Sequence, residues 1–417
     1  MGKAKPYDIS KKVVWEAYKR VKANRGAAGV DGQSLTEFDK DLKGNLYRVW
    51  NRMSSGSYFP SPVRLVEIPK SDGQKRPLGI PTVTDRVAQT VAKMCLEPVV
   101  ERKFHPDSYG SRPGKSALDA VATCRKRCWR ASWVIDLDVK GFFDNLDHDL
   151  VMRAVRHHTG IPWLLLYIER WLQAPVRKRD GALVQRTAGT PQGGVISPLL
   201  ANLFMHHAFD DWMRRNFPRV QFERYVDDVV IHCVSEEQAR HVLEAVRCRL
   251  KQCGLELHPV KTKIVFCKDG NRHRKYEPTK FDFLGFTFQP RRACNRQGQF
   301  FVSFLPAISN KAAKEIKRTI RGWRLAATRN NQSLEVLARL MDPCVRGWMN
   351  YYGRFYRSKC IQVLRHLERV LVRWAMRKYK RFRYRERAAT HWLGRIARRD
   401  PNLLAMWQLG IKPAAGQ

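Results

Sequence analysis

The sequence predicts an α+β protein whose mixed body of strands and helices is followed by an all-helical segment. Alternating apolar residues indicate short strands at residues 132–139 and around Tyr225 to Asp228, with helical periodicity between them. Residues 311–400 are almost wholly helical in pattern and hold 25 Lys and Arg against 6 Asp and Glu. A stretch with Pro and Gly at 290–298 separates the two parts, so we expect a domain boundary near residue 300.

The elements before the first of these strands follow in order. Residues 8–25 predict a basic amphipathic helix, because apolar residues recur there at helical spacing. The glycine-containing stretch 26–34 ends this helix, and a second helix is expected from Leu35 to Met53. Residues 62–80 predict an extended hairpin that turns at KSDGQKRP, and helical periodicity returns from Thr84 to Phe104.

The charge balance points to a polyanionic partner. The 417 residues hold 78 Lys and Arg against 38 Asp and Glu, a formal net charge of +40. A charge of this size repels itself unless nucleic acid or an anionic surface neutralises it. No apolar run approaches the roughly 20 residues that span a bilayer, and the N-terminus lacks the apolar stretch of a secretory signal. We therefore expect nucleic acid as the partner, no membrane, and a cytosolic protein.

Ten cysteines occur without a CxxC pair. Cys124 and Cys128 can share a helix face, but no second pair follows at zinc spacing. Reduced thiols, mostly buried as small apolar side chains, are therefore the favoured interpretation.

Two acidic segments have the chemistry of a phosphoryl-transfer site. Transfer to a 3′-hydroxyl uses two divalent cations roughly 3.5–4 Å apart, and Mg²⁺ takes oxygen ligands from a few carboxylates. Asp227 and Asp228 lie in a tight hairpin turn where both can face one ion, although Asp pairs are also common in solvated turns. Asp136 and Asp138 share one face of the first strand, about 6–7 Å apart. These four carboxylates are the candidates for a two-metal site.

The order of several motifs resembles that of the reverse transcriptases encoded by group II introns. YVDD follows a strand, IDLDVKGFFDNLDH lies about ninety residues before it, and TPQGGVISPLLANLF lies between them. The resemblance covers roughly residues 10–400. Further matching segments are NRGAAGVDGQSLTEF (24–38), RPLGIPTVTDRVAQ (76–89), SYGSRPGKSALDAV (108–121), GLELHPVKTKIV (254–265) and FDFLGFTF (281–288).

The resemblance implies a right-hand polymerase. Residues 1–60 would extend the fingers, residues 61–300 would form fingers and palm with an antiparallel sheet, and residues 301–417 would form a helical thumb and maturase segment. The implied reaction is template-directed transfer of deoxynucleotides from dNTPs to the 3′-hydroxyl of a primer, mainly on an RNA template.

The resemblance also assigns a metal site residue by residue. Asp138, Asp227 and Asp228 match the three catalytic carboxylates, and the backbone carbonyl of Val139 matches a further metal contact. Spacing alone leaves Asp136 open beside Asp138. The implied cofactors are two Mg²⁺ ions, with Mn²⁺ as a substitute.

A second group of residues matches the dNTP pocket. Phe143, five positions after the first catalytic Asp, resembles the steric gate that clashes with a ribose 2′-hydroxyl. Lys70 and Arg76 flank the KSDGQKRP turn and match cations that clamp a triphosphate. Lys261 matches a proton donor to the pyrophosphate leaving group, with Lys263 as an alternative. The residues implied to bind dNTP are Lys70, Arg76, Phe143, Gln192, Gly193 and Lys261.

The segment TPQGGVISP has a physical logic of its own. Gln192 can hydrogen-bond a ligand, and Gly193 permits close approach of the backbone. Ser197 and Pro198 predict the N-cap and first position of a helix that runs on through Phe209.

The segment PCVRGWMNYYGRFY (343–356) resembles the maturase region that forms the thumb in this family. Cationic side chains on helices can follow a phosphate backbone, while aromatic faces stack on unpaired bases. Trp348, Tyr352 and Phe355 also fit a core stripe, so we expect one face to pack and the opposite face to meet RNA. The run 373–387 is strongly basic as well. The residues implied to bind RNA are Arg346, Trp348, Tyr351, Tyr352 and Arg354.

Two departures from the family pattern bear on the biological role. Val226 stands in YVDD where the family most often has Ala, and a β-branched residue there narrows the pocket at the primer end. The His, Asn and paired-Cys pattern of an intron endonuclease does not follow the maturase-like region. We therefore expect priming from an existing nick or a replication-fork strand.

The combined expectation is an RNA-directed DNA polymerase that carries out target-primed cDNA synthesis and binds intron RNA to assist splicing and mobility. The expected partners are intron RNA or another RNA template, a DNA primer or target, and dNTPs, in a bacterial cytosol or nucleoid. The sequence is compatible with a monomer and with a homodimer. The alternatives are a domesticated or defence-associated reverse transcriptase without an intron, and an RNA-binding splicing factor with a vestigial polymerase site.

Overall fold

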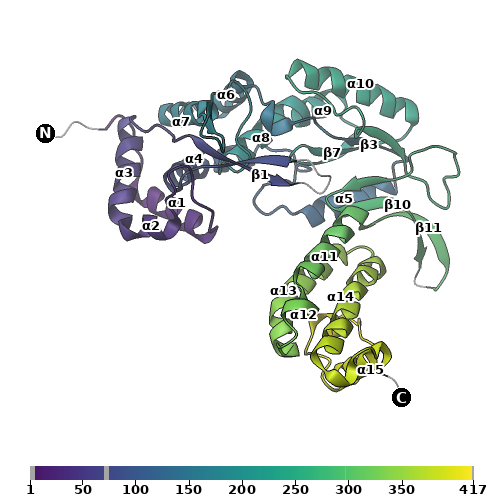
Figure 1. Ribbon diagram of the computed structural model, residues 1–417. Helices are drawn as coiled ribbons and strands as arrows, with labels where there is room; N and C mark the ends of the chain where they lie inside the picture. Colours follow the sequence, from purple (N-terminus) through teal and green to yellow (C-terminus); the bar gives the residue numbers. More distant parts are fainter. Residues whose placement is uncertain (1–4, 70–74, 296, 416–417) are drawn as a thin grey trace. The chain divides into compact units, whose positions relative to one another are not determined.

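The computed structural model describes residues 5–69, 75–295 and 297–415 (Figure 1). The chain folds as two compact units, the first made of residues up to 127 together with 133–264. The second consists of residues 128–132 and the chain from 265 onward. Helices and β-sheet occur in both units, which confirms the predicted mixture of helix and sheet.

Three helices begin the first unit. Ser10 caps α1 (Lys11–Ala23), where its hydroxyl accepts the N–H of Lys12. The single helix predicted from Leu35 to Met53 is wrong, because the structure divides it into α2 (Leu35–Lys40) and α3 (Leu42–Ser55). Asp41 leaves the helical conformation between them, and its carboxylate accepts the N–H of Gly44 to cap α3.

The glycine-containing segment between α1 and α2 packs against the start of α4 (Val83–Glu101). A Cβ at Gly29 would lie 2.6 Å from the Cα of Thr82, so only glycine permits this approach. Arg86 of α4 donates to the carbonyl of Ala27 at 2.8 Å. The helix break predicted here is therefore a closely packed connection.

A four-stranded sheet with the order β2-β1-β4-β5 follows these helices. β1 (Val63–Pro69) and β2 (Lys75–Ile80) pair antiparallel, which confirms the predicted hairpin, while its turn lies outside the described residues. β1 also pairs in parallel with β4 (Val176–Arg177), and β4 pairs antiparallel with β5 (Leu183–Val184).

A second sheet holds the two acidic segments. Its order is β6-β7-β3-β8, and β7 runs antiparallel to both β6 and β3. The predicted strand at 132–139 and the predicted hairpin around Tyr225 to Asp228 are thereby confirmed. α10 (Glu236–Gln252) packs on β3 and β7 and lies above them in Figure 1, with α5 (Ala117–Cys128) below. The strands are β3 (Trp133–Leu137), β6 (Gln221–Tyr225), β7 (Asp228–Cys233) and β8 (Lys263–Phe266).

A π-helical turn interrupts the helices that support this sheet. α8 (Ser197–Met205) continues through the turn η2 (His206–Asp210) into α9 (Asp211–Asn216). α8 packs against α6 (His148–His158), which packs in turn on α7 (Pro162–Gln173). η2 also packs on α10, the helix that packs on β3 and β7.

The second unit combines a three-stranded antiparallel sheet with helices. The sheet has the order β11-β10-β9, with β9 (Phe281–Phe283), β10 (Phe286–Cys294) and β11 (Phe300–Ile308). β11 pairs with β10 along its whole length, so strands reach further along the chain than the sequence pattern indicated. The boundary near residue 300 stays a prediction.

Helices then dominate the second unit, which confirms the helical pattern predicted for residues 311–400. Trp374 and Trp407 are the largest side chains of their buried core, and Leu367 lies fully buried beside them. The helices are α11 (Asn310–Gly322), α12 (Leu325–Thr328), α13 (Leu334–Tyr352), α14 (Arg357–Lys378), α15 (Glu386–Arg399) and α16 (Ala405–Gln408).

The cysteines and the membrane expectation can be compared directly with the structure. All ten cysteines are free and six of them are buried, as predicted. In the described part of the chain, no helix has both the length and the apolar character needed to cross a bilayer.

Candidate active site

Strand register brings two of the predicted catalytic carboxylates together. β3 pairs with β7 from Trp133↔Cys233 to Leu137↔Val229. Continuing this register by one residue places Asp138, at the end of β3, opposite Asp228, the first residue of β7. Directly opposed residues on antiparallel strands have Cβ atoms about 4.5–5.5 Å apart, so two carboxylates ninety positions apart in sequence become neighbours.

The third carboxylate lies in a strained two-residue turn. Tyr225 pairs with Asp228, which leaves Val226 and Asp227 as the loop of the β6–β7 hairpin. Val226 has φ +62°, a left-handed conformation that is rare for a β-branched residue. Asp227 and Asp228 are both partly exposed, so an ion from solvent can reach their carboxylates.

A single buried arginine holds this turn. Arg224 is fully buried and donates to the carbonyl of Val226 at 2.9 Å. Its Nε and Nη2 atoms form a bidentate pair with the fully buried Asp210, at 2.7 and 2.6 Å. The remaining donors go to Asn202 Oδ1 at 2.9 Å and Ser108 Oγ at 2.8 Å. All five guanidinium N–H groups therefore have an acceptor.

Gly110 closes the other side of the turn. A Cβ at this position would lie 2.6 Å from the Val226 nitrogen, closer than real contacts allow. The carbonyl of Gly110 accepts from Asn202 Nδ2 at 2.7 Å, so the asparagine that binds Arg224 also holds Gly110. The strained turn is thus held on two sides, by the Arg224 hydrogen bond to the Val226 carbonyl and by the close contact of Gly110 with the Val226 nitrogen.

The segment that holds Asp138 is anchored through its backbone. The carbonyl of Asp138 accepts the His258 N–H at 2.8 Å. The backbone N–H of Asp138 donates to Thr262 Oγ1 at 3.2 Å. Val139 forms an isolated antiparallel bridge with Leu257. With its backbone held in this way, Asp138 directs a carboxylate that is 43% exposed toward solvent.

The two lysines left as alternatives by the sequence lie beside different carboxylates. Lys261 Nζ is 3.7 Å from Asp138 Oδ2, whereas Lys263 Nζ is 3.5 Å from Asp136 Oδ2. Asp136 is the more enclosed of the two acids, with 13% of its side chain exposed. The geometry therefore favours Asp138 and Lys261 as the pair that can face a substrate.

The Gln192–Gly193 turn packs against strand β2. The carbonyl of Gln192 accepts the Gly79 N–H at 2.7 Å. Gly193 has φ +119°, and a Cβ there would lie 2.4 Å from the Gly79 carbonyl oxygen. Ser197 is the first residue of α8 rather than the predicted N-cap, and its hydroxyl accepts from Thr190 Oγ1 at 2.8 Å.

The same loop holds the predicted steric gate. Phe143 lies in a short 3₁₀ turn, η1 (Phe142–Asp144), and its carbonyl accepts the Thr190 N–H at 2.8 Å. A Cβ at Gly189 would lie 2.7 Å from that carbonyl oxygen. Phe143 and the Gln192–Gly193 turn, some fifty positions apart in sequence, are therefore parts of one local structure.

Lys70 and Arg76 are the two cations predicted to clamp the triphosphate. Lys70 lies outside the described residues. Arg76 belongs to β2, where its backbone pairs with Ile68. Their contact with a triphosphate stays a prediction.

The predicted RNA-binding residues divide between packed and exposed positions. Tyr351 and Tyr352 pack on Phe286, with ring centroids 5.2 and 5.6 Å away, and Tyr351 also donates to the carbonyl of Leu284. Trp348 stacks on Trp323 at 5.7 Å. Arg354 is exposed, and the exposed Arg346 donates to Gln408 at 2.9 Å. RNA contact by these five residues stays a prediction.

Sequence reasoning missed Arg224 and its partner Asp210. It also missed a buried group on the same sheet, in which ligand atoms of Cys124, Glu223 and His232 lie within 4.8 Å of one another. Arg127 donates to Glu223 at 2.6 Å, and His232 Nε2 lies 2.6 Å from the other carboxylate oxygen. A charged residue in an apolar strand was the available signal, since such a residue needs a buried partner.

Carboxylates at the ends of adjacent antiparallel strands, with a loop and hairpin around them, have the donor chemistry that nucleotidyl transfer with divalent cations requires. Residues 68–288 match the family described as reverse transcriptase (RNA-dependent DNA polymerase), which is more than half of the chain. Residues 313–392 match the group II intron maturase-specific domain. The chain therefore belongs to the reverse transcriptases and is an RNA-directed DNA polymerase of the group II intron type.

Individual relatives agree with this placement. Protein YkfC of Escherichia coli (strain K12) is 34% identical over 335 residues, which cover 70% of this chain and 84% of YkfC. Group II intron-encoded protein LtrA of Lactococcus lactis subsp. cremoris is 32% identical over 203 residues, 48% of this chain and 33% of LtrA. Retron Ec48 reverse transcriptase of Escherichia coli is 24% identical over 306 residues, 71% of this chain and 66% of that protein. The chain thus spans most of YkfC but only a third of LtrA.

Replacing Gly193 by Ala tests the close contact between the loop and β2. The added Cβ would meet the Gly79 carbonyl and displace the Gln192–Gly193 turn. A displacement of about 1 Å can cost on the order of 10²-fold in rate, so we expect a loss of that size in kcat/KM for dNTP. Gly181→Ala is the matched control, because Gly181 also has a positive φ (+90°) but nothing within 4 Å of the added atom. Equal losses in both variants would contradict the steric explanation.

Replacing Arg224 by Met tests the buried hydrogen-bond network that supports the Val226–Asp227 turn. The change leaves Asp210 buried without its counter-charge, so we expect a loss of about 3–5 kcal/mol in the free energy of unfolding. Arg214→Met removes an ion pair at an exposed position, in which Nε and Nη2 both donate to Asp211 Oδ1, and should cost less than about 1 kcal/mol. Thermal unfolding followed by circular dichroism measures both. Similar shifts in the two variants would contradict the proposed support.

Proposed function

We propose that Asp138, Asp227 and Asp228, together with the backbone carbonyl of Val139, hold two Mg²⁺ ions for primer extension, with Mn²⁺ as a substitute. The observation that carries this proposal is the β3–β7 register, which sets Asp138 opposite Asp228 next to the turn of Asp227. The donor set fits the ions, because Mg²⁺ prefers oxygen ligands and keeps open positions for substrate phosphates. When bound, such ions activate the primer hydroxyl and stabilise the charge on the transferring phosphate.

The surrounding residues orient and select the dNTP. Gln192 and Gly193 present a turn whose backbone is fixed against β2, so a nucleotide can rest on a rigid surface. Phe143 excludes nucleotides that carry a 2′-hydroxyl, in line with its family role as steric gate. Lys70 and Arg76 clamp the triphosphate from the hairpin.

Lys261 supplies a proton to the pyrophosphate leaving group. Its ammonium lies 3.7 Å from the carboxylate of Asp138, which keeps the charged group at the site. Lys263 is less suited to this task, because it faces Asp136 instead.

The second unit acts as thumb and RNA-binding segment of a right-hand polymerase. The cationic side chains of the run 373–387 are mostly exposed, while its Trp374 and Phe382 are buried. Tyr384 in this run is 84% exposed beside Arg383, a pairing suited to stacking on an unpaired base. Burial and then Lys317, Arg373 and other cations lower the pKa of His366, so cations of both α11 and α14 act on this side chain.

The biological role that follows is binding of an intron RNA, assistance to its splicing, and target-primed cDNA synthesis during its mobility. The maturase-specific match supports this role over a reverse transcriptase without an RNA-folding task. The partners are the intron RNA, a DNA target that supplies the primer, and dNTPs, in a bacterial cytosol or nucleoid.

Primer extension on an RNA template with Mg²⁺ and dNTPs tests the metal site. We expect Asp227→Ala to lose at least about 10²–10³-fold in rate, because a charge aimed at the transition state is removed. Asp149→Asn is the control, since this exposed acid belongs to the first turn of α6 and not to the strand ends or the hairpin. Undiminished extension by Asp227→Ala would contradict the assignment. If neither the wild-type protein nor Asp227→Ala extends the primer, the result favours the alternative of an RNA-binding splicing factor.

The salt dependence of RNA binding tests the basic run. Changing Arg381, Arg383 and Arg385 to Gln should reduce the slope of log K against log salt by about 0.7 for each phosphate of single-stranded RNA that is no longer neutralised. Fluorescence anisotropy with a labelled single-stranded RNA measures the slope. The control changes Arg240, Arg247 and Arg318, which are also exposed but already paired with glutamates on their own helices. Equal changes in both triple variants would argue against a localised RNA site.

A further inference from the structure

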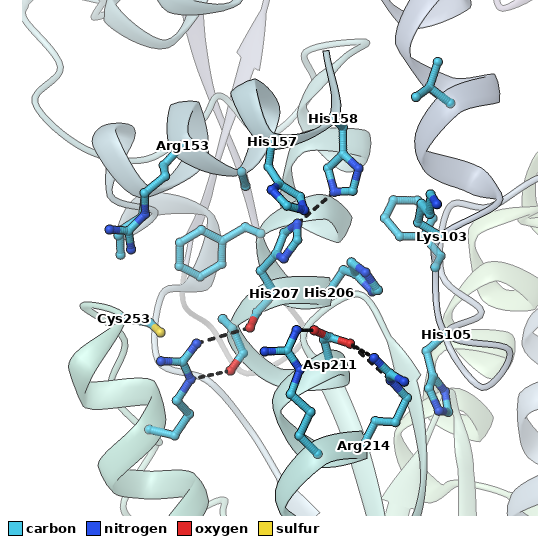
Figure 2. A pocket seen from close by; sticks show the side chains of 18 of the residues that line it. Lys103, His105, Arg153, His157, His158, His206, His207, Asp211, Arg214 and Cys253 are labelled. Carbon is cyan, nitrogen blue, oxygen red and sulfur yellow. Dashed lines mark hydrogen bonds and ion pairs between the residues drawn. The ribbon is translucent and has the colours of Figure 1, made fainter. Parts of the chain in front are cut away.

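A pocket in the first unit lies apart from the residues assigned to polymerase chemistry (Figure 2). Its volume is about 740 Å³, and it is bordered by the end of α4, the end of α6, the turn η2, α9 and α10. The residues that line it include none of those assigned above to the metal ions or the dNTP. A cavity of this size can hold a small organic molecule, because ligand pockets commonly measure about 300–1,000 Å³.

Cationic side chains reach this pocket from four separate segments of the chain. One follows α4, one belongs to α6, two belong to α9 and one belongs to α10. Like charges that meet in a concave site repel each other, and the protein walls focus their field on an anion that enters. The lining residues that carry charge at neutral pH are Lys103, Arg153, Arg214, Arg215 and Arg249, against the single carboxylate of Asp211.

Most of this positive charge is not neutralised by the protein itself. Lys103 and Arg153 are exposed, and neither side chain has a hydrogen bond or an ion pair in the described part of the chain. Figure 2 shows them on opposite sides of the pocket's histidines. Arg214 and Arg215 share one carboxylate, that of Asp211, so this group also keeps an excess positive charge. Lys103 and Arg153 can therefore bind an anion without breaking an existing contact.

The remaining residues suit the organic part of a ligand. Phe104 and Phe204 are buried at the pocket, and aromatic faces can pack against a planar base. Imidazoles add planar rings that can stack on a base or hydrogen-bond its edge. Five of the twelve histidines of the chain line the pocket, namely His105, His157, His158, His206 and His207. The apolar residues of the lining are Val99, Phe104, Leu150, Ala154, Phe204 and Ala208.

We propose that this pocket binds a small phosphorylated ligand of nucleotide size, with its phosphate groups at Lys103 and Arg153 and its base against the aromatic and apolar lining. The guanidinium of Arg153 can bind a phosphate through two parallel N–H donors, and the ammonium of Lys103 acts as a point charge. A ligand with both an anionic and a planar apolar part uses both kinds of lining. The site is distinct from the dNTP site of the polymerase.

The turn η2 connects this pocket to the support of the β6–β7 hairpin. π-helical turns are rare and occur often at functional sites. η2 lines the pocket with His207, and it also carries Asp210, the partner of Arg224. Arg249 fixes the turn, because it donates to the carbonyls of His207 and Ala208 at 3.2 and 3.0 Å. A ligand in the pocket would therefore contact a rigid part of the same support.

Isothermal titration calorimetry of the intact chain with the four ribonucleoside triphosphates tests the proposal. EDTA is present to remove the divalent ions that carboxylates bind, and ribonucleotides carry the 2′-hydroxyl that the proposed gate Phe143 disfavours at the dNTP site. We expect one ribonucleotide to bind per chain, more tightly than inorganic phosphate, which lacks a part for the apolar lining. Lys103→Gln and Arg153→Gln should each weaken binding about 10- to 100-fold, the effect of losing a hydrogen bond to a charged group.

Arg102→Gln and Arg156→Gln are the matched controls. These exposed arginines are neighbours of Lys103 and Arg153 in sequence and remove the same charge, but they do not line the pocket. At about 0.15 M salt, where the Debye length is about 8 Å, they should change the affinity less than about twofold. All four variants replace exposed side chains, so they should unfold as the wild-type protein does.

Three results would overturn the proposal. Equal losses of affinity in all four variants would mean that the net charge of +40, and not a defined site, attracts the nucleotide. Absence of binding by every ribonucleotide would mean that the pocket is not a nucleotide site. A single-stranded RNA whose binding depends on Lys103 and Arg153, when no ribonucleotide binds, would assign these cations to the phosphates of an RNA backbone instead.

Discussion

The β6–β7 hairpin depends on the hydrogen bonds and the ion pair that the buried guanidinium of Arg224 forms. A fully buried charge is tolerated only when it is paired and its donors are satisfied, and all five N–H groups of Arg224 meet acceptors. One acceptor is the carbonyl of Val226, a residue held at φ +62°. The Arg224 network thus maintains the unfavourable conformation of the turn, because relaxing the turn would break hydrogen bonds that stabilise more than the strain costs.

Close backbone contacts extend this support from the sheet to the loop that holds Gln192 and Gly193. Gly110 lies against the Val226 turn, Gly189 against the Phe143 turn, and Gly193 against Gly79 of β2. At each place a Cβ would meet backbone atoms at 2.4–2.7 Å, so backbone rather than side chain forms the contact. Backbone has fewer ways to rearrange than side chains do, which suits a pocket that must hold reacting atoms in a fixed geometry.

The sequence was sufficient for the strands and the turn that carry Asp138, Asp227 and Asp228, because strand periodicity and a tight turn are local properties that residues 132–139 and 225–228 display directly. The choice of these three as metal ligands comes from the family resemblance and stays a prediction. The sequence was not sufficient for Arg224 and Asp210, which lie fourteen positions apart on a strand and a π-helical turn. It also joined α2 and α3 into one helix, because the capping carboxylate of Asp41 competes with helix continuation in a way that apolar spacing does not reveal.

By itself the sequence determined the class of the chain, the strands and the hairpin that carry the acidic residues, and the helical character of residues 311–400. These depend on local pattern and on side-chain chemistry, which are present before folding. Only the tertiary structure decided that Lys261 faces Asp138 while Lys263 faces Asp136, and that histidines from α6 and η2 meet in one pocket. Such pairings depend on strand register and helix packing, which arise from contacts between residues far apart in the chain.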